Sequence, residues 1–229
     1  MGLRLEEVVP WGRSMSEYIR MFDLSEADLH RKILDCAAGP ASFNAEMTRA
    51  GYSVISCDPI YQFSADEIQK RVEETYAIVL EKVEASKDKF IWTTFKSPEE
   101  MGQTRLAAMR EFIADFPNGL QQGRYRTEEF PVFSFESNQF DLTLCSHLLF
   151  TYSDQFSFEF HLASILEMCR VSTEVRIFPL LVNVMAEVSP FLDLIIEALR
   201  EREFEAAIAP VPYEFQRGGN QMLRVLKKH

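Results

Sequence analysis

Short apolar runs alternate with helical patterns along most of this chain, and this alternation restricts the possible folds more than any other feature. The apolar runs are bounded by charged residues or Gly and have the length of buried strands: Lys32–Cys36, Ser53–Cys57, Phe140–Cys145 and Val175–Leu181. Amphipathic patterns with helical spacing lie around them: Met15–Phe22, Ser42–Ala50, Phe158–Cys169 and Phe191–Glu201. Continuous apolar strands that alternate with helices predict an α/β fold, in which helices cover both faces of a mainly parallel sheet.

Residues 62–120 interrupt this alternation, because no strand is predicted between Asp58 and Gly123. Two helical patterns occur there instead: Ile68–Val83, and a second that begins at Ser97 and ends at Pro117-Asn118-Gly119. A disordered acidic linker is the alternative, but the regular spacing and the aromatic residues of this stretch disfavour it. We therefore expect a single domain over residues 1–229, with residues 62–120 as a helical insertion after the second strand.

The end of the chain has the pattern of a hairpin. Two extended runs, Phe204–Phe215 and Gln221–Leu226, flank Gly218-Gly219-Asn220. An antiparallel terminal strand is therefore expected in an otherwise parallel sheet.

Charge and composition exclude several classes of function. Asp and Glu number 35 against 24 Lys and Arg, a net charge of −11, and an acidic surface repels phosphate backbones, so we expect no nucleic-acid partner. No run approaches the roughly 18 apolar residues of a membrane span, and the first residues lack the apolar core of a signal peptide. The 4 Cys form no CxxC pair and the 4 His no HxxxH pattern, so we expect reduced thiols and no metal site. These features predict a cytoplasmic protein with no membrane partner.

A run of small residues carries the strongest functional signal. Ile33-Leu34-Asp35-Cys36-Ala37-Ala38-Gly39-Pro40-Ala41-Ser42-Phe43 leads from a predicted strand through a turn into a helix. Small residues at such a turn let a ligand approach the backbone, at the sheet edge where α/β proteins bind ligands. Asp58 ends the next strand, where an acid can accept both hydroxyl groups of a ribose. Together these features predict a nucleoside cofactor.

The turn favours S-adenosylmethionine (SAM) over a dinucleotide. A pyrophosphate favours three glycines, whereas Ala37, Gly39 and Ser42 stand here, and Pro40 has no N–H for a phosphate. SAM has no phosphate, and its positively charged end suits a nearby acid such as Asp35. Two alternatives remain open: an NAD(P)-dependent oxidoreductase, and a catalytically silent domain that binds SAM.

On these residues the chain resembles the class I SAM-dependent methyltransferase family. Asp35–Phe43 is similar to the family's first motif, with Ala in place of its outer glycines, and Asp58 matches its ribose-binding acid. Thr127–Pro131 is similar to the stretch that borders the adenine, and Phe140–His147 to the fourth-strand motif near the transferring methyl. The resemblance covers roughly residues 30–60 and 123–229, and it implies a Rossmann-like, seven-stranded sheet.

The resemblance also implies the residues of a site. His147 is the candidate general base; the alternative is that it only packs or forms a hydrogen bond at a strand end. Arg13 would meet the methionine carboxylate, or be an ordinary surface arginine. The remaining cofactor-binding candidates are Asp35, Ala37, Gly39, Pro40, Asp58, Pro59, Thr127, Glu128 and Ser146.

The methyl acceptor is expected to be a small molecule with an oxygen or nitrogen nucleophile, and an acidic protein suits a cationic or neutral one. The insertion over residues 62–120 follows the C-terminal end of a strand, so it lies on the cofactor side of the sheet. It would form a lid over the acceptor pocket, or act as a structural support or as the surface of a homodimer.

Overall fold

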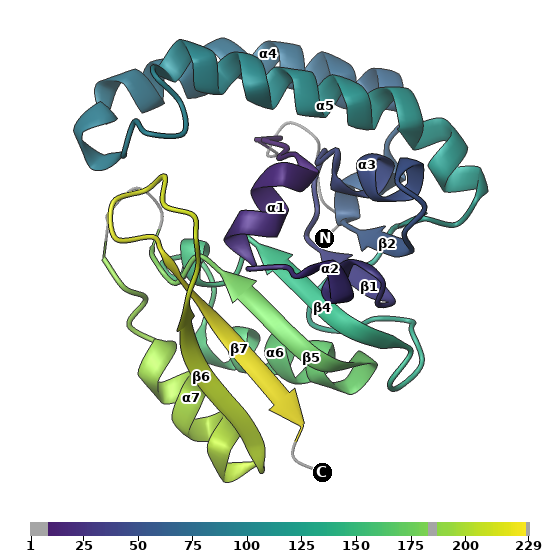
Figure 1. Cartoon of the computed structure of the whole chain (residues 1–229), viewed down its shortest axis with the longest axis vertical. Helices are drawn as coiled ribbons and strands as arrows, with labels where there is room; N and C mark the ends of the chain where they lie inside the picture. The colour runs from purple at the N-terminus through teal and green to yellow at the C-terminus, as the bar shows by residue number, and fades with distance from the viewer. Residues whose placement is uncertain (1–8, 183–186, 228–229) are drawn as a thin grey trace.

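The computed structural model describes residues 9–182 and 187–227. Within them, seven strands form one sheet in the order β3-β2-β1-β4-β5-β7-β6 (Figure 1). The strands from β1 to β5 pair in parallel, and β7 lies antiparallel between β5 and β6. The strands are β1 Ile33–Cys36, β2 Val54–Cys57, β3 Tyr125–Arg126, β4 Phe140–Ser146, β5 Ser172–Phe178, β6 Phe204–Pro210 and β7 Gln221–Lys227. The predicted fold class, with its antiparallel terminal strand, is confirmed.

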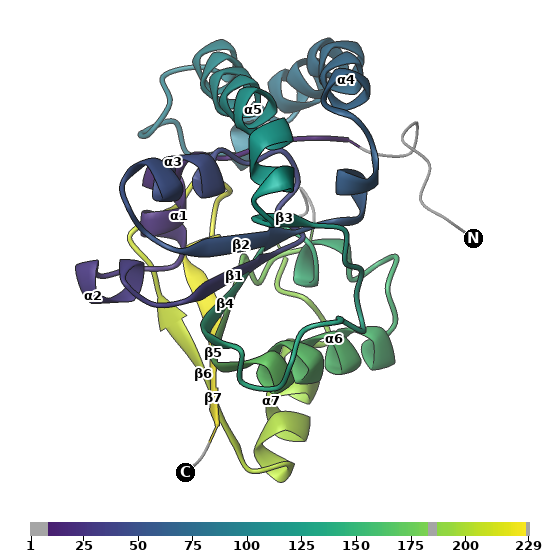
Figure 2. The ribbon, with the colours of Figure 1, turned by 90° about the vertical axis from the view of Figure 1, so that its right-hand side faces the viewer.

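Helices cover both faces of the sheet, which explains why its central strands are apolar throughout (Figure 2). On one face lie α1 (Met15–Met21), α2 (Glu26–Leu29) and α3 (Phe43–Arg49), packed on side chains such as Ile33 and Leu142. On the other face α6 (Phe158–Val171) and α7 (Leu192–Glu201) pack on Leu34 and Cys145.

The register of the three central strands brings their ends together. Cys36 of β1 pairs with Cys57 of β2 and with Cys145 of β4. The residues that follow these three cysteines therefore meet at one edge of the sheet. Ala37, Asp58 and Ser146 are those residues.

The predicted insertion after the second strand is a pair of helices that lie side by side above this edge (Figures 1 and 2). A short 3₁₀ turn, η2 (Pro59–Gln62), leads from β2 into α4 (Ala65–Ala85), and α5 (Pro98–Gln121) follows. The hydroxyl groups of Ser64 and Ser97 cap the two helices at their N-termini.

The predicted end of the second insertion helix at Pro117-Asn118-Gly119 is wrong, because α5 continues to Gln121. Gly123 follows the end of the helix, and its φ of 72° is the left-handed conformation typical of the residue after a helix C-terminus. There the N–H groups of Gly123 and Arg124 donate to the last carbonyls of the helix.

The predicted extension of the terminal hairpin to Phe215 is also wrong, because β6 ends at Pro210. Residues 211–220 leave the sheet and reach the insertion, where the N–H of Ile91 donates to the carbonyl of Phe215 (2.7 Å). The ring of Phe215 stacks on Phe90, with centroids 4.8 Å apart. The C-terminal loop, residues 211–220, is therefore held against the insertion, by ring stacking and by an isolated antiparallel bridge between Phe90 and Gln216, and not by an extension of β6.

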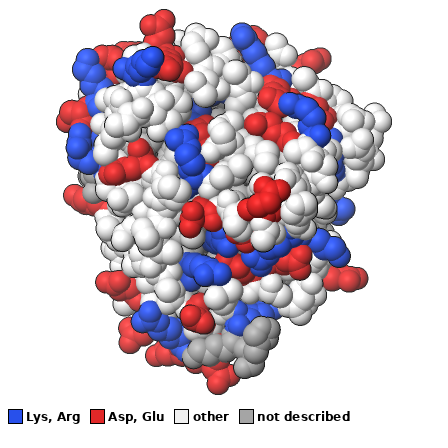
Figure 3. Space-filling model, viewed as in Figure 1, with Lys and Arg blue, Asp and Glu red and all other residues white. Residues whose placement is uncertain are grey.

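The surface of the face seen in Figure 1 carries acidic and basic side chains that are interspersed rather than gathered in one patch (Figure 3). Of the helices in the described part of the chain, none combines the length and the apolar character needed to cross a bilayer.

Candidate functional site

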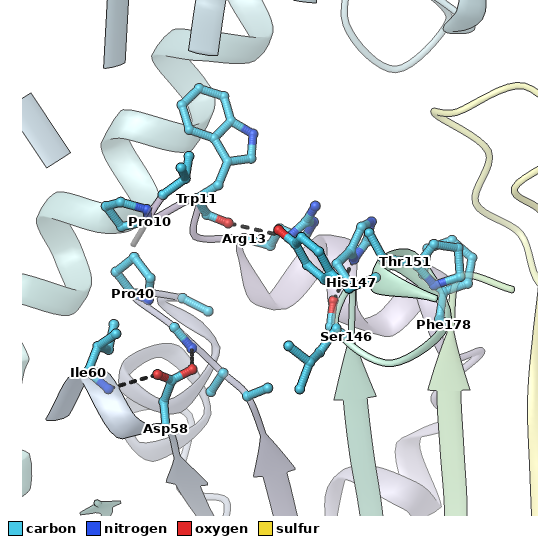
Figure 4. Close-up of a pocket in the computed structure, with 18 of the residues that line it drawn as sticks. Pro10, Trp11, Arg13, Pro40, Asp58, Ile60, Ser146, His147, Thr151 and Phe178 are labelled. Atoms are coloured by element: carbon cyan, nitrogen blue, oxygen red, sulfur yellow. Dashed lines mark hydrogen bonds between the residues drawn. The ribbon is translucent and has the colours of Figure 1, made fainter. Parts of the chain in front are cut away.

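A cavity of about 970 Å³ lies above the C-terminal ends of β1, β2, β4 and β5 (Figure 4). Small-molecule sites occupy roughly 300–1,000 Å³, so this cavity has room for a nucleoside cofactor and a second small molecule. Its floor is the turn after β1 and the ends of the neighbouring strands. Its walls come from the leader (residues 9–14), the insertion and the C-terminal loop.

The turn after β1 has a left-handed backbone and is fixed by hydrogen bonds to β2 and η2. Ala37 and Gly39 both have left-handed φ angles, 52° and 54°. The N–H of Ala38 donates to the carbonyl of Cys57 (3.2 Å), and the hydroxyl of Tyr61 donates to the carbonyl of Gly39 (2.8 Å). A Cβ atom added at Gly39 would meet no other atom within 4 Å, so the space beside this glycine is free for a ligand.

Asp58 lies beside this turn and lines the cavity. Its carboxylate accepts hydrogen bonds from the N–H groups of Gly39 and Ile60, each 2.9 Å long. Burial raises the pKa of Asp58 to about 6, so the group is mostly ionised at neutral pH. Each of its oxygens keeps a second lone pair, which suits the two hydroxyl groups of a ribose.

Asp35, in contrast, does not reach the cavity. It is completely buried under Tyr18, whose hydroxyl lies 3.2 Å from one carboxyl oxygen, while Ser56 Oγ lies 3.3 Å from the other. Burial raises the pKa of Asp35 to about 8. Tyr18, not the predicted Asp35, therefore faces the space above the turn.

The leader crosses the turn and places Arg13 in the cavity wall. A Cβ atom at Gly12 would lie 2.0 Å from the carbonyl oxygen of Pro40, so only glycine permits this approach. The guanidinium of Arg13 donates to the carbonyl of Trp11 (3.3 Å), while its buried Nε has no partner. Burial and the nearby Arg105 lower the pKa of Arg13 to about 10, which leaves it protonated at neutral pH. A carboxylate ligand would satisfy this side chain.

A buried ion pair joins α1 to the insertion, and the sequence patterns did not predict it. Arg105 of α5 forms a salt bridge with Glu17 of α1, and both side chains are almost fully buried. The hydroxyl of Tyr213 in the C-terminal loop donates to the same carboxylate (3.0 Å). Although burial opposes it, Arg105 and Arg13 lower the pKa of Glu17, so the pair is ionised. The available signal was Arg105 itself, a cation on the apolar stripe that includes Met101, Met109 and Phe112.

His147 lies at the end of β4 between Arg13 and Phe178 (Figure 4). Its backbone has a φ of 54°, and its N–H donates to the carbonyl of Phe178 (2.7 Å). Nδ1 of the imidazole is 2.7 Å from Ser146 Oγ. Burial, with Arg13 and Arg105 nearby, lowers the pKa of His147 well below its ordinary value. The imidazole is therefore neutral at neutral pH, and the same groups disfavour its protonated form.

The other predicted cofactor residues divide into two groups. Ala37, Pro40, Pro59, Glu128 and Ser146 line the cavity. Glu128 also accepts a hydrogen bond from the N–H of Ser134 (3.0 Å), which fixes its carboxylate. Thr127 is exposed and is not among the residues that line the cavity, so the stretch after β3 contributes its acid but not its hydroxyl.

Across residues 9–182 and 187–227, no cluster of His, Cys, Asp or Glu is arranged to hold a metal ion.

Comparison with known proteins gives one clear relative. No protein-family model matches the chain. The uncharacterized protein MJ0045 of Methanocaldococcus jannaschii is 36% identical over 222 residues, which cover 96% of this chain and 97% of that protein.

Solved structures that align with the chain have low identity to it. Magnesium protoporphyrin IX methyltransferase (ChlM) from Synechocystis PCC 6803 with bound SAM aligns with a TM-score of 0.48 and 10% identity, over 93% of this chain and 78% of that one. A putative SAM-dependent methyltransferase from Methanococcus maripaludis aligns with a TM-score of 0.47 and 12% identity, over 93% of this chain and 83% of that one.

Proposed function

We propose that this chain, which belongs to the same family as the M. jannaschii protein MJ0045, is a SAM-dependent methyltransferase acting on a small molecule. The observation that carries the proposal is that three groups line one cavity. Asp58 suits a ribose, the open turn at Gly39 suits a close ligand, and the unpartnered Nε of Arg13 suits a carboxylate. A nucleoside with an aminoacyl tail has these features in this order.

The same turn argues against an NAD(P)-dependent oxidoreductase. A pyrophosphate needs free N–H groups at the start of the helix after β1. Here Pro40 has no N–H, and the N–H of Ser42 donates to the carbonyl of Arg13 (3.0 Å). The leader thus takes up a donor that a dinucleotide would require.

SAM supplies a methyl group on a sulfonium, which is already a good leaving group, so the protein contributes mainly alignment and exclusion of water. The acceptor's lone pair forms the new bond to the methyl carbon, while the electrons of the carbon–sulfur bond pass to sulfur. His147, which lies beside the proposed acceptor space, would take the proton that an oxygen or nitrogen acceptor loses. It would hold this proton only transiently and release it to solvent, because burial, Arg13 and Arg105 disfavour the charged imidazole. Ser146 would orient the ring through its contact with Nδ1.

Calorimetric titration with S-adenosylhomocysteine and with NADH tests the cofactor. We expect binding of the first and not of the second, and the reverse result would overturn the proposal. Asp58→Ala should weaken S-adenosylhomocysteine binding by about 1.5–3 kcal/mol, the magnitude of a hydrogen bond to a charged group. Asp193→Ala, which removes an exposed acid on α7 outside the cavity, is the matched control and should leave the affinity unchanged.

The role of His147 requires a substitution that keeps the local backbone. Asn tolerates the positive φ of this position better than Ala does, so His147→Asn removes the base with little strain. We expect turnover to fall by a factor of about 10²–10⁴ while S-adenosylhomocysteine affinity is kept. His30→Asn, at an exposed histidine, is the control. Unchanged turnover in His147→Asn would mean that His147 only packs at the strand end. If the wild-type protein binds S-adenosylhomocysteine but methylates no acceptor, that result would favour the catalytically silent alternative.

A further inference from the structure

The acidic groups of the cavity all lie at one side of it. Among the described residues that line the cavity, the only carboxylates are those of Asp58, Glu128 and Glu129. Asp58 follows β2 and the two glutamates follow β3, and these strands are neighbours at one edge of the sheet. The acids therefore surround the place proposed for the nucleoside.

The opposite side of the cavity has cationic groups and no carboxylate on its surface. Arg13 and Arg105 line it near His147, and Lys82, whose side chain is exposed to solvent, lines it from the last turn of α4. The end of α4 lies near the C-terminal loop, away from β2 (Figure 1), and Phe90 stacks there on Phe215. Arg71 also lines the cavity, in the first half of α4, where it lies 3.6 Å from Glu74.

Glu17 offsets only part of this positive charge. It is buried behind the cavity wall and forms its salt bridge with Arg105, while Arg13 has no carboxylate partner among the described residues. In the proposed complex the methionine carboxylate of SAM pairs with Arg13, but SAM also brings a sulfonium and an ammonium group. With the methyl donor in place, the remaining space is therefore still cationic.

The electrostatic potential on this side of the cavity differs in sign from the net charge of the whole chain. The net charge of −11 favours a cationic acceptor, and on the face seen in Figure 3 the two signs are interspersed. Inside the cavity, however, the field that an acceptor meets comes from the nearest groups, since distant surface charges are screened by solvent. The nearest groups here are cations.

Several aromatic rings also line this cationic side of the cavity, which we call the acceptor side. Flat apolar walls bind planar apolar molecules through area and ring contacts. The rings are those of Phe90, Tyr152, Phe156, Phe160, Phe178, Tyr213 and Phe215.

On these grounds, and resting on the proposed function, we infer that the methyl acceptor is an aromatic carboxylate, with its ring among these side chains and its carboxylate toward Lys82. Attraction between the acceptor's carboxylate and the sulfonium of bound SAM adds to the preference for an anionic acceptor. A neutral analogue lacks this attraction, and a cationic analogue is repelled by the same groups.

Two sets of matched compounds test the charge of the acceptor. The first set is 4-hydroxybenzoate, 4-hydroxybenzamide and tyramine, and the second is 4-aminobenzoate, 4-aminobenzamide and 4-aminobenzylamine. Binding of each to the protein saturated with S-adenosylhomocysteine is measured by calorimetry, and turnover is measured with SAM. We expect each carboxylate to bind at least tenfold more tightly than its amide, with the amine weakest.

The binding measurement decides the inference whether or not a compound is methylated. An amide or amine that binds as tightly as the carboxylate, to a protein that binds S-adenosylhomocysteine normally, overturns the inference and leaves the proposed function standing. Failure to bind S-adenosylhomocysteine overturns both.

Lys82→Glu locates the anionic group. It should weaken carboxylate binding at least tenfold and strengthen amine binding, without changing S-adenosylhomocysteine affinity. Lys70→Glu makes the same charge change on the same helix, at a residue that does not line the cavity and is 79% exposed. We expect no effect from Lys70→Glu; equal effects of the two variants would contradict a local contact at Lys82.

Discussion

The two sides of the cavity are built in different ways. The nucleoside side comes mainly from one continuous unit, residues 33–62, whose groups meet through short backbone contacts such as Gly39 N–H to Asp58. The acceptor side comes from segments far apart in the sequence, which meet where Glu17, Arg105 and Tyr213 touch. The first side needs only two neighbouring strands, β1 and β2, with the turn and helix that connect them, whereas the second exists only once the whole chain has folded.

The largest effect on stability should come from a substitution that removes the contact between distant segments on the acceptor side. Glu17→Ala leaves Arg105 buried without its counter-ion, which typically costs about 3–5 kcal/mol of unfolding free energy. Chemical denaturation measures this loss, and Glu197→Ala, at an exposed acid on α7, should change stability by no more than about 0.5 kcal/mol. A loss below about 1 kcal/mol in Glu17→Ala would mean that this ion pair does not hold the segments of the acceptor side together.

The buried acid beneath the turn should make stability depend on pH. The folded state raises the pKa of Asp35 to about 8, so it holds a proton that the unfolded chain releases near pH 4. Stability therefore falls as pH rises from about 4 to 8. Asp35→Asn cannot ionise, so its stability relative to the wild type should rise by about 1–3 kcal/mol between pH 5 and pH 9. Parallel pH profiles for the two proteins would show that Asp35 is ionised in the fold.

Nucleoside binding should depend on pH in the opposite direction. Asp58 has a pKa of about 6, and protonation removes an acceptor for the ribose hydroxyl groups. If only the ionised form binds, S-adenosylhomocysteine affinity at pH 5 should be about tenfold lower than at pH 7, or about 1.4 kcal/mol. Asp35 remains protonated across this range and adds little. Asp58→Asn should remove the dependence, and a dependence that persists in this variant would assign it to another group.

The smallest effect concerns the turn backbone. Ala37 adopts a left-handed φ of 52°, which is unfavourable for residues with a Cβ. Ala37→Gly should therefore stabilise the protein by about 0.5–1 kcal/mol, after the greater freedom of Gly in the unfolded chain is counted. Gly39→Ala is the converse case, because its Cβ meets no atom and only strain is added. It should destabilise by a similar amount, and thermal melts of the two variants should move in opposite directions.

The difference between local and long-range contacts also decides which parts of the site could be predicted from the sequence. The turn at Gly39, the acid at Asp58 and the strand end at His147 follow from local pattern and from the register of parallel strands, and the structure brings them to one edge. The burial of Asp35 was not predictable, because it depends on how Tyr18 packs across the sheet. Arg105 was visible as a cation on an apolar stripe, but its partner Glu17 lies 88 residues away and no local pattern connects them.

The position of α4, α5 and the C-terminal loop above the sheet also has a kinetic consequence. The turn that would receive the methyl donor is the floor of the cavity, and α4, α5 and the C-terminal loop stand over it. An acceptor seated among the aromatic rings would cover the donor and block its exchange. The reaction should therefore follow a compulsory order, in which the donor arrives first and its demethylated product departs last.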